Sequence, residues 1–370
     1  MKPDAIPLVD LRAQHQAIAT DVERGFARVL EATAFILGEE VAAFEREYAE
    51  FSQVAHCVGV ANGTDALEIA LRALGIGPGD DVIVPTNSFF ATAAAVARAG
   101  AKPVLVDCDP THHLIDVASA RARLTQWTKA IIPVHLYGQI APMEEVAALA
   151  AERELVVVED AAQAQGASRN GHVAGGFGAA AGTSFYPGKN LGAYGDAGAV
   201  LTNSAEVTKH VRALRNYGSE VKYEHPELGF NSRLDALQAA VLRVKLRRLA
   251  AWNAARRRAA RRYDELLAQV SAVQPPATLE GNEHVWHLYV VRVPRRDEVL
   301  ARLNAEGIGA GIHYPVPIHL QGAFSHLGHR QGDFPVAEAA AAELLSLPIF
   351  PEITAEQQER VVAALVRALG

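Results

Sequence analysis

The amino-acid sequence predicts an α/β protein with a mostly parallel central sheet and a smaller C-terminal α/β domain. Three observations support this prediction. The chain has 370 residues, which suits one large domain and one smaller domain. From about residue 60 to 205, short apolar runs rich in β-branched residues alternate with alanine-rich helical stretches, as in a sheet covered by helices. A long helical stretch from Leu234 to Val270 then ends before the Pro275-Pro276 pair, and we place the domain boundary there, between residues 1–270 and 271–370.

The expected strands of the large domain are short apolar runs, each bounded by turn or helix signals. They are Val82–Val84, Val104–Val106, Ala130–Val134, Leu155–Glu159, Gly182–Tyr186 and Ala199–Thr202. The smaller domain is expected to contain a strand at His287–Val293, a helix at Asp297–Glu306 and a terminal helix after Thr354. Residues just beyond the carboxyl ends of parallel strands usually face a ligand. Asp107, His135 and Asp160 occupy such positions, which makes them candidates for a functional site.

Composition and charge exclude several classes of protein. The formal net charge of −7 argues against general binding to nucleic acids or anionic membranes. The basic residues of the 234–270 stretch suit a solvated or interdomain helix face, because no aromatic residues are interleaved with them as in a nucleic-acid motif. No apolar stretch reaches the length of a membrane span. Cys57 and Cys108 form no disulfide framework and lack metal-ligand spacing, so we expect a soluble, unprocessed cytoplasmic protein without a metal ion.

Lys189 is the most informative single residue. It lies in the stretch Ser184-Phe185-Tyr186-Pro187-Gly188-Lys189-Asn190-Leu191-Gly192, among glycines and small apolar residues, with no acid before Asp196. Partial desolvation lowers the pKa of an amine and frees its lone pair for covalent chemistry with an aldehyde. A lysine in a glycine-rich turn is more often a solubilising loop residue, so a reactive role requires partners elsewhere in the chain.

Two other motifs provide such partners. Gly63 and Thr64 open an amphipathic helix with free backbone N–H groups, which is typical of a phosphate site, although Thr or Asp at a helix start also serves as a cap. Asp160 ends an apolar run, where a carboxylate needs a cation or several donors unless it caps the next turn. Gln163 follows on the same side of a helical turn. Phe89, just beyond the first predicted strand, is placed either to stack on a ring or to join the core.

An amine, a carboxylate for a protonated pyridine nitrogen and a helix end for a phosphate are together what a pyridoxal phosphate enzyme requires. Six motifs in order resemble the DegT/DnrJ/EryC1/StrS sugar aminotransferases, within the aspartate aminotransferase-like fold type I of pyridoxal phosphate-dependent transferases. The resemblance covers nearly the whole chain. The motifs are Pro7-Leu8-Val9-Asp10-Leu11, Gly63-Thr64-Asp65-Ala66-Leu67, Glu159-Asp160-Ala161-Ala162-Gln163, the Lys189 segment, Gly229-Phe230-Asn231-Ser232-Arg233-Leu234-Asp235 and His313-Tyr314-Pro315-Val316-Pro317-Ile318-His319.

The resemblance implies pyridoxal 5′-phosphate as the cofactor and pyridoxamine 5′-phosphate as its intermediate form. It also implies L-glutamate as the amino donor and a nucleotide-linked keto-sugar as the acceptor. Lys189 is then expected to bond to the cofactor aldehyde and to carry protons as a base. Asp160 would pair with the pyridine nitrogen, Gln163 would lie near the ring hydroxyl, and Phe89 would stack on the ring.

The resemblance further implies a homodimer with shared sites. Gly63, Thr64 and Ser184 are expected to bind the phosphate. Asn231 would reach the same phosphate from the neighbouring subunit. The loop from Tyr217 to Asn231 would then serve the partner's site, with Tyr217 expected to bind substrate there. Residues 1–270 would then comprise an N-terminal arm, the cofactor-binding domain and the long connecting helix.

The residue three positions before the lysine indicates which sugar carbon is aminated. Many family members that act at C4 of a hexose have a histidine there, whereas this chain has Tyr186 and resembles members that act at C3 of a dTDP-3-keto-6-deoxyhexose. We therefore expect Tyr186 to contribute to catalysis and substrate binding in a C3 aminotransferase, with C4 amination as the alternative. His313, Tyr314 and His319 resemble the substrate-side motif of the family, and each also suits a structural role in a proline-rich turn.

Three other classes fit the sequence less well. Family members that deoxygenate a sugar have a different residue in place of Lys189. A nucleotide-sugar dehydrogenase needs a glycine-rich turn after its first strand, but the nearest match, at residues 176–181, follows no apolar run. A non-catalytic regulatory protein that binds the cofactor or a sugar nucleotide is the alternative from another class. The presence of Lys189 and Asp160 together with the phosphate residues favours an enzyme.

Overall fold

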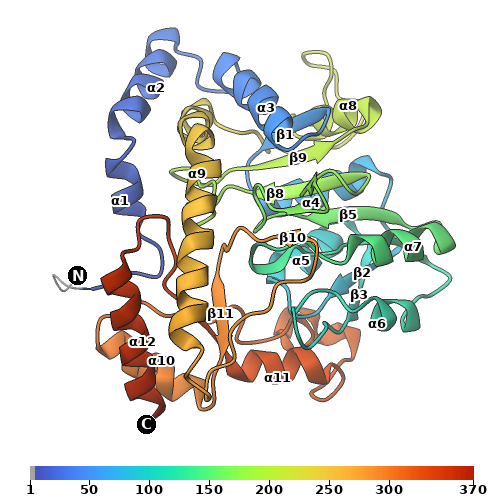
Figure 1. Cartoon of the computed structure of the whole chain (residues 1–370). Helices are drawn as coiled ribbons and strands as arrows, with labels where there is room; N and C mark the ends of the chain where they lie inside the picture. The colour runs from blue at the N-terminus through green and yellow to red at the C-terminus, as the bar shows by residue number, and fades with distance from the viewer. Residues whose placement is uncertain (1–4) are drawn as a thin grey trace.

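The structure, a computed structural model, describes residues 5–370 and has a seven-stranded sheet at its centre (Figure 1). The strand order is β1-β9-β8-β5-β4-β2-β3. The strands are β1 His56–Val60, β2 Asp81–Pro85, β3 Lys102–Val106, β4 Thr128–Ile131, β5 Val156–Asp160, β8 Ala180–Ser184 and β9 Gly198–Thr202. The pairings from β3 through β2, β4 and β5 to β8 are parallel, and only those of β9 with β8 and β1 are antiparallel. The predicted α/β fold with a mostly parallel sheet is therefore confirmed.

All six strands expected in the large domain are present, each within a few residues of its expected bounds. One further strand, β1, pairs with β9 at the edge of the sheet and was not predicted from the sequence. Its sequence, His-Cys-Val-Gly-Val, is a short run with a central glycine. Glycine is depleted in strands, so local propensity is weak there, and pairing with β9 is what makes the segment a strand.

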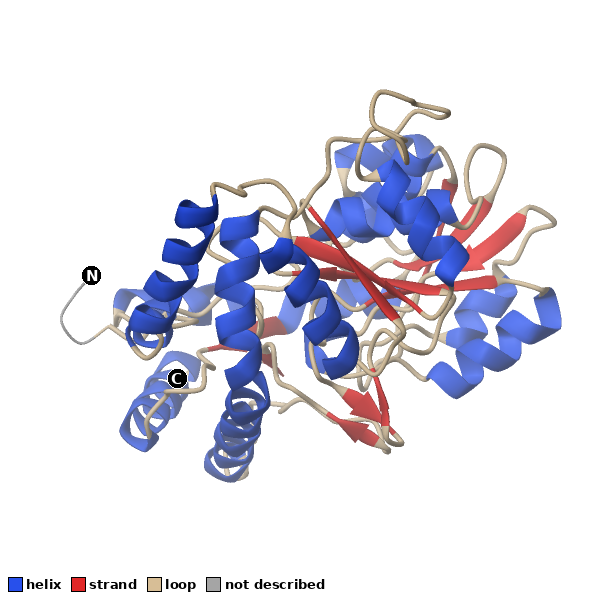
Figure 2. Ribbon diagram, turned by 90° about the horizontal axis from the view of Figure 1, so that it is seen from above, coloured by secondary structure: helices blue, strands red, loops and turns tan. Residues whose placement is uncertain are grey.

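Helices cover both faces of the sheet, as Figure 2 shows. Successive side chains of a strand point to opposite faces, so Val82 and Val84 join one buried cluster while Ile83 joins the other. One face packs against α4 (Gly63–Ala73), α5 (Phe90–Ala99) and α8 (Ala205–Leu214). The opposite face packs against α3 (Glu39–Phe51), α6 (Val117–Ala122), α7 (Met143–Arg153) and part of α9 (Ala236–Leu267). Two more helices, α1 (Leu11–Gln16) and α2 (Ala19–Ala32), precede α3.

The C-terminal part is built on an antiparallel pair of strands, β11 (Tyr289–Arg292) and β12 (Leu344–Leu347). The helices around it are α10 (Arg296–Ala305), α11 (Pro335–Glu343) and α12 (Ala355–Leu369), so the three elements expected there are present. Thr354 starts α12 with a capping box, in which Gln357 returns a bond to its backbone. The start of this terminal helix could be predicted from the sequence because a capping box involves only residues close together in the chain.

The long helix α9 runs from the side of α3 toward α12 (Figure 1). Its C-terminal half contributes Tyr263 to the core of the C-terminal part, and Ile6 joins the same core from the other end of the chain. A small sheet links both parts as well, because β10 (Asn282–Glu283) pairs with β6 (Ser168–Arg169), which in turn pairs with β7 (His172–Val173). The division at residue 270 stays a prediction, since the packing crosses it. None of the helices within residues 5–370 combines the length and apolar character needed to cross a membrane.

Candidate active site

A cavity of about 660 Å³ lies at the carboxyl ends of β5 and β8, beside the start of α4. Ten of the residues expected from the sequence line it, although they come from five separate stretches of the chain: Gly63, Thr64, Phe89, Asp160, Gln163, Ser184, Tyr186, Lys189, His313 and Tyr314. Parallel strands end at the same edge of a sheet, which is why motifs far apart in sequence meet there.

Lys189 lies in a tight turn directly after β8. Its backbone N–H donates to the carbonyl of Tyr186 at 2.8 Å, so one closed turn places both residues at the cavity wall. Burial lowers the pKa of the Lys189 amine from 10.5 to about 8, and the nearby carboxylate of Asp160 opposes this shift. A larger fraction of this amine is therefore neutral and nucleophilic near pH 7 than in an exposed lysine.

The first turn of α4 forms an anion cradle. Asn62 is the N-cap, and its side chain accepts a bond from the N–H of Asp65 at 2.9 Å. Within residues 5–370, the N–H groups of Gly63 and Thr64 have no hydrogen-bond partner, so they remain available to a phosphate. A Cβ on Gly63 would lie 2.6 Å from the Cβ of Ser184, which explains why a glycine is needed at this close approach. Since Asn62 is the cap, Thr64 is free for a ligand.

Asp160 ends β5 at the base of the cavity and is 5% exposed. Its Oδ2 accepts a bond from the hydroxyl of Thr92 at 2.7 Å, and its Oδ1 accepts one from the N–H of Ala162 at 3.1 Å. The carboxylate thus caps the turn that follows it, which was one of the two roles expected from the sequence. The other expected role, binding a cation, also remains open to it, because each carboxylate oxygen can accept more than one bond.

Phe89 and Tyr314 form an aromatic wall, with ring centroids 5.2 Å apart. Gln163 joins this wall by donating from Nε2 to the Tyr314 oxygen at 2.9 Å. The pKa of Tyr314 is raised well above its usual range, mainly by burial and also by the negative charge of the nearby Asp160. His313 bonds through Nδ1 to the hydroxyl of Ser346 at 2.8 Å. Burial and the positive charge of Lys189 lower the pKa of His313 to about 4, so its ring is neutral at pH 7.

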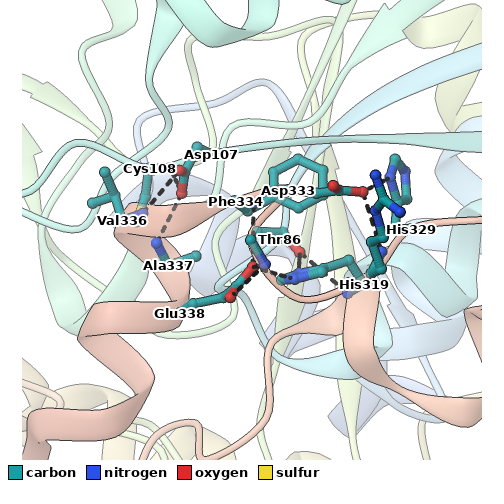
Figure 3. Close-up of polar contacts among 12 residues, drawn as sticks. Thr86, Asp107, Cys108, His319, His329, Asp333, Phe334, Val336, Ala337 and Glu338 are labelled. Atoms are coloured by element: carbon teal, nitrogen blue, oxygen red, sulfur yellow. Dashed lines mark hydrogen bonds and ion pairs between the residues drawn. The ribbon is translucent and has the colours of Figure 1, made fainter.

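His319 does not line the cavity. It is 2% exposed, and Figure 3 shows it between Thr86 and Glu338. Its Nδ1 lies 2.9 Å from the hydroxyl of Thr86, and its Nε2 lies 3.0 Å from the carboxylate of Glu338. Because a carboxylate only accepts, Nε2 carries the proton and Thr86 donates to Nδ1 in the neutral ring. The structure therefore gives His319 a role in joining three segments, and its geometry does not support a contact with substrate.

Asp107 and His135 also lie at strand ends but do not face the cavity, so the expectation of ligand-facing side chains is wrong for both. The carboxylate of Asp107 accepts bonds from the N–H groups of Val336 and Ala337 at 3.0 and 2.9 Å, which completes the first turn of α11 (Figure 3). His135 is fully buried, and its Nε2 lies 2.8 Å from Glu159. Both side chains are used by internal partners.

Asn231 and Tyr217 lie outside the cavity of their own chain. The side-chain oxygen of Asn231 accepts a bond from Arg233 at 2.6 Å, and the guanidinium of Arg233 lies 5.6 Å from the centre of the Tyr217 ring. Tyr217 is half exposed on this loop. The expected contribution of both residues to a partner's site therefore stays a prediction about the dimer.

Three residues of the site were not anticipated. His287 and Arg98 line the cavity, and Thr92 supports Asp160 from behind it. Burial, followed by the charge of Lys189, holds the pKa of His287 well below its usual range. Arg98 is paired with Asp65 and Glu68 at 3.2 and 2.7 Å, which offsets its charge. None of the three has a local signal for its role, because Ser88, which bonds to Thr92, precedes α5 and helical periodicity does not connect the two.

The residues around this cavity fit pyridoxal 5′-phosphate. The free N–H groups of Gly63 and Thr64 match a phosphate, the amine of Lys189 matches an aldehyde, and the carboxylate of Asp160 matches a protonated ring nitrogen. Within residues 5–370, no cluster of His, Cys, Asp and Glu has the geometry of a metal site. The fold and the site together define a pyridoxal phosphate-dependent transferase of fold type I.

Comparison with known proteins identifies the family. The profile of the DegT/DnrJ/EryC1/StrS aminotransferase family matches residues 16–366. The chain belongs to this family and is a pyridoxal phosphate-dependent aminotransferase. The solved structure of DesV from S. venezuelae in complex with a ketimine intermediate superposes with a TM-score of 0.96, at 44% identity over 98% of both chains.

Several curated relatives match nearly end to end. A pleiotropic regulatory protein of Geobacillus stearothermophilus is 49% identical over 96% of this chain and 96% of its own. A UDP-N-acetyl-3-dehydro-alpha-D-glucosamine 3-aminotransferase of Acidithiobacillus ferrooxidans is 48% identical over 99% of this chain and 98% of its own. A dTDP-3-amino-3,4,6-trideoxy-alpha-D-glucose transaminase of Streptomyces venezuelae is 44% identical over 97% of this chain and 95% of its own.

Proposed function

We propose that this enzyme transfers the amino group of L-glutamate to C3 of a dTDP-linked 3-keto-6-deoxyhexose. The observation that carries the proposal is the position of Tyr186 at the cavity wall, 59% exposed and held by its carbonyl to the backbone of Lys189. Tyr186 and Lys189 line the same cavity, so we expect an acceptor sugar bound there to contact the Tyr186 ring. A phenol offers a hydrogen bond and an aromatic face where a histidine would offer a group that titrates near neutral pH.

The names of two relatives support amination at C3. The Acidithiobacillus ferrooxidans protein is a 3-aminotransferase of a UDP-sugar, and the Streptomyces venezuelae protein is named for a dTDP-3-amino sugar. They differ in nucleotide and agree in the sugar carbon. The relatives therefore support a nucleotide-linked keto-sugar as the acceptor. The choice of dTDP as its carrier rests on the Tyr186 motif.

Each residue has a defined task in this reaction. The cofactor, when bound, supplies an aldehyde and an electron-accepting ring. The Nζ atom of Lys189, with its lowered pKa, would act as the base that removes the proton from the donor's α-carbon in the first half-reaction. In the second half-reaction it would act as the acid that delivers a proton to the sugar carbon being aminated. Asp160 holds the proton of the ring nitrogen, and Gly63 and Thr64 bind the phosphate through their N–H groups. Phe89 and Tyr314 shield the ring from water.

We also propose that the functional unit is a homodimer with two shared sites. The exposed loop that contains Tyr217 and Asn231 lies outside its own cavity, and its large apolar side chains are exposed in the single chain. Burial against a second copy would remove these side chains from water. Asn231 would then supply an amide to the partner's phosphate, as family resemblance suggests.

The test is incubation of the purified enzyme with L-glutamate and a panel of 3-keto and 4-keto sugars carried by dTDP, UDP or GDP. Products are identified by mass spectrometry and NMR. We expect amination at C3 with the dTDP sugar preferred. Amination only at C4 would overturn the Tyr186 argument, whereas C3 amination of a UDP sugar alone would overturn the choice of nucleotide.

A regulatory protein is the second candidate, favoured by the name of the Geobacillus stearothermophilus relative. Such a protein would bind the cofactor or a sugar nucleotide without turnover. The absorption spectrum separates the two candidates. We expect a yellow protein whose absorption changes when L-glutamate is added, because the first half-reaction needs no sugar. A yellow protein that is unchanged by L-glutamate and by all other amino acids would favour the regulatory candidate.

A further inference from the structure

Two buried hydroxyl groups form a chain that ends on Asp160. The oxygen of Ser88 lies 2.7 Å from the hydroxyl oxygen of Thr92, and the Thr92 hydroxyl lies 2.7 Å from Oδ2 of Asp160. Thr92 is 0% exposed, and Ser88, which lines the cavity, is 3% exposed, so the bond between Thr92 and Asp160 is shielded from water. Thr92 does not line the cavity and reaches it only through Asp160.

The direction of both bonds follows from chemistry. An ionised carboxylate only accepts, so the single proton of the Thr92 hydroxyl points to Asp160. The Thr92 oxygen must then act as the acceptor for the hydroxyl of Ser88. The chain therefore runs one way, from Ser88 through Thr92 to Asp160, and it places the positive end of each hydroxyl dipole toward the carboxylate.

We propose that Thr92, supported by Ser88, is a positioning residue for the ring nitrogen of the cofactor, acting through Asp160. This inference rests on the assignment of Asp160 as the partner of that nitrogen. The carboxylate is fixed at both oxygens, because Oδ2 is held by Thr92 and Oδ1 by the N–H of Ala162 at 3.1 Å. Rotation of the carboxylate would break both bonds. Its free lone pairs are therefore held in one plane before the cofactor arrives.

The same two residues tie this carboxylate to the aromatic wall. Ser88 precedes Phe89, and the N–H of Thr92 donates to the carbonyl of Phe89 at 3.1 Å in the first turn of α5. The segment that presents the Phe89 ring is thus bonded to the side chain that faces the ring nitrogen. One rigid turn sets the position of two groups that are expected to contact the same ring.

The test measures cofactor binding to the apo protein, with no amino donor and no sugar. Thr92→Val removes the hydroxyl with little change in shape, and Thr92→Ser keeps it. We expect the dissociation constant of pyridoxal phosphate to rise severalfold, up to about tenfold, in Thr92→Val, because the freed carboxylate must then be ordered when the cofactor binds, and to change less than about twofold in Thr92→Ser. Thr208→Val is the matched control, since Thr208 is also buried but donates to the carbonyl of Ser204, away from the cavity.

Melting temperatures of the apo and cofactor-bound forms separate positioning from simple stabilisation. A structural hydroxyl would lower both temperatures equally, as we expect for Thr208→Val, and would leave the increment caused by the cofactor unchanged. We expect Thr92→Val to reduce that increment. If Thr92→Val does not yield folded protein, Thr92→Ala removes the same donor with less bulk and is read in the same way.

Asp160→Asn distinguishes two ways of failing. If Asp160→Asn binds the cofactor weakly while Thr92→Val binds it within twofold of the wild type, the positioning role is overturned and the assignment of Asp160 stands. If Asp160→Asn binds the cofactor as the wild type does, Asp160 is not the partner of the ring nitrogen, and the positioning role of Thr92 is overturned as well. Neither result depends on which sugar the enzyme aminates.

Discussion

The side-chain amide of Gln163 donates to the phenolic oxygen of Tyr314 at 2.9 Å, joining motifs that lie 151 residues apart in the chain. The other end of the same amide accepts a bond from the backbone N–H of Tyr137 at 2.6 Å. Both ends of Gln163 are therefore occupied, which fixes its orientation. Because the Tyr314 oxygen accepts from Gln163, its own proton remains free to donate into the cavity.

Tyr314→Phe tests this relationship. The change leaves the Nε2 group of Gln163 without its acceptor, so we expect unfolding to become easier by about 1–3 kcal/mol and cofactor affinity to fall severalfold. Urea unfolding and titration of the apo protein with pyridoxal phosphate provide the measurements. Tyr223→Phe is the control, because Tyr223 is 82% exposed and should tolerate the loss of its hydroxyl. If both variants have the same unfolding free energy and the same cofactor affinity, the Tyr314 hydroxyl has no role in the site.

Lys189 gives a prediction about pH. Its amine reacts only when neutral, and its pKa is lowered to about 8 by burial. We expect the rate of cofactor capture by the apo protein to rise with pH through a midpoint near 8, well below the range of an ordinary lysine. Stopped-flow absorption measures this rate. Lys189→Ala should abolish both the absorption change and turnover while still binding the cofactor through Asp160 and the phosphate cradle.

Burial lowers the pKa of Lys245 to about 8 as well, but this residue does not line the cavity. Lys245→Met is therefore the control, and it should leave the midpoint unchanged. A midpoint that moves with Lys245, or wild-type activity in Lys189→Ala, would contradict the assignment of Lys189 as the reactive amine.

Gly63→Ala tests the phosphate cradle. The new methyl group would meet the Cβ of Ser184 at 2.6 Å and its Cα at 3.1 Å, so the start of α4 must move away from β8. We expect a loss of cofactor affinity of about tenfold or more, because the N–H groups of the first turn would no longer converge on the phosphate. Gly322→Ala is the control, since nothing lies within 4 Å of its added methyl group. Fluorescence titration of both apo proteins would show whether only the first loses the cofactor.

The sequence predicted the parts of this protein whose signals are local. The run Leu155–Glu159 predicted a strand observed at Val156–Asp160, and Thr354 predicted the start of α12. The residues of the cavity were predicted for the same reason, since Lys189 and Asp160 each lie in a distinctive short motif. Local motifs specify which side chains are unusual, and parallel strand topology then brings them to one edge.

Partners chosen by tertiary structure were not predictable. Asp107 looked ligand-facing at a strand end, but the amides that occupy it belong to Val336 and Ala337, 229 and 230 residues further along the chain. His135 was misplaced for the same reason, because its Nε2 donates a hydrogen bond to the carboxylate of Glu159 inside the core. Thr92 is the converse case, a functional residue that was not predicted. It lies in the alanine-rich helix α5 and gains its role only because Asp160 is beside it.

His319→Leu tests whether this histidine is structural. The change removes the ring that bonds to the hydroxyl of Thr86 and to the carboxylate of Glu338, while Glu338 keeps its bonds from the N–H groups of two backbone neighbours. We therefore expect a loss of about 1–3 kcal/mol in the free energy of unfolding. Glu338→Gln keeps an acceptor for His319 and should lose less. Urea unfolding measures both. Normal stability combined with a raised KM for the nucleotide sugar would instead mean that His319 contacts the substrate.

Mixed dimers test whether the active sites are shared between subunits. In a shared site Lys189 comes from one chain and Asn231 from the other. Lys189→Ala and Asn231→Ala should each be impaired alone, yet a mixed dimer would contain one site with both native residues. If subunits exchange at random, half of the dimers are mixed and one site in each is intact, so activity should recover to about a quarter of the wild-type value.

The control for this experiment mixes Lys189→Ala with Asp160→Ala. Both residues line the cavity of the same chain, so every site in such a mixed dimer lacks one of them and no activity should return. The position of Asn231 outside its own cavity, bonded to Arg233, is what makes the two mixtures differ. Recovery in neither mixture, with subunit exchange verified by a size-distinguishable tag, would mean that Asn231 does not act across the interface.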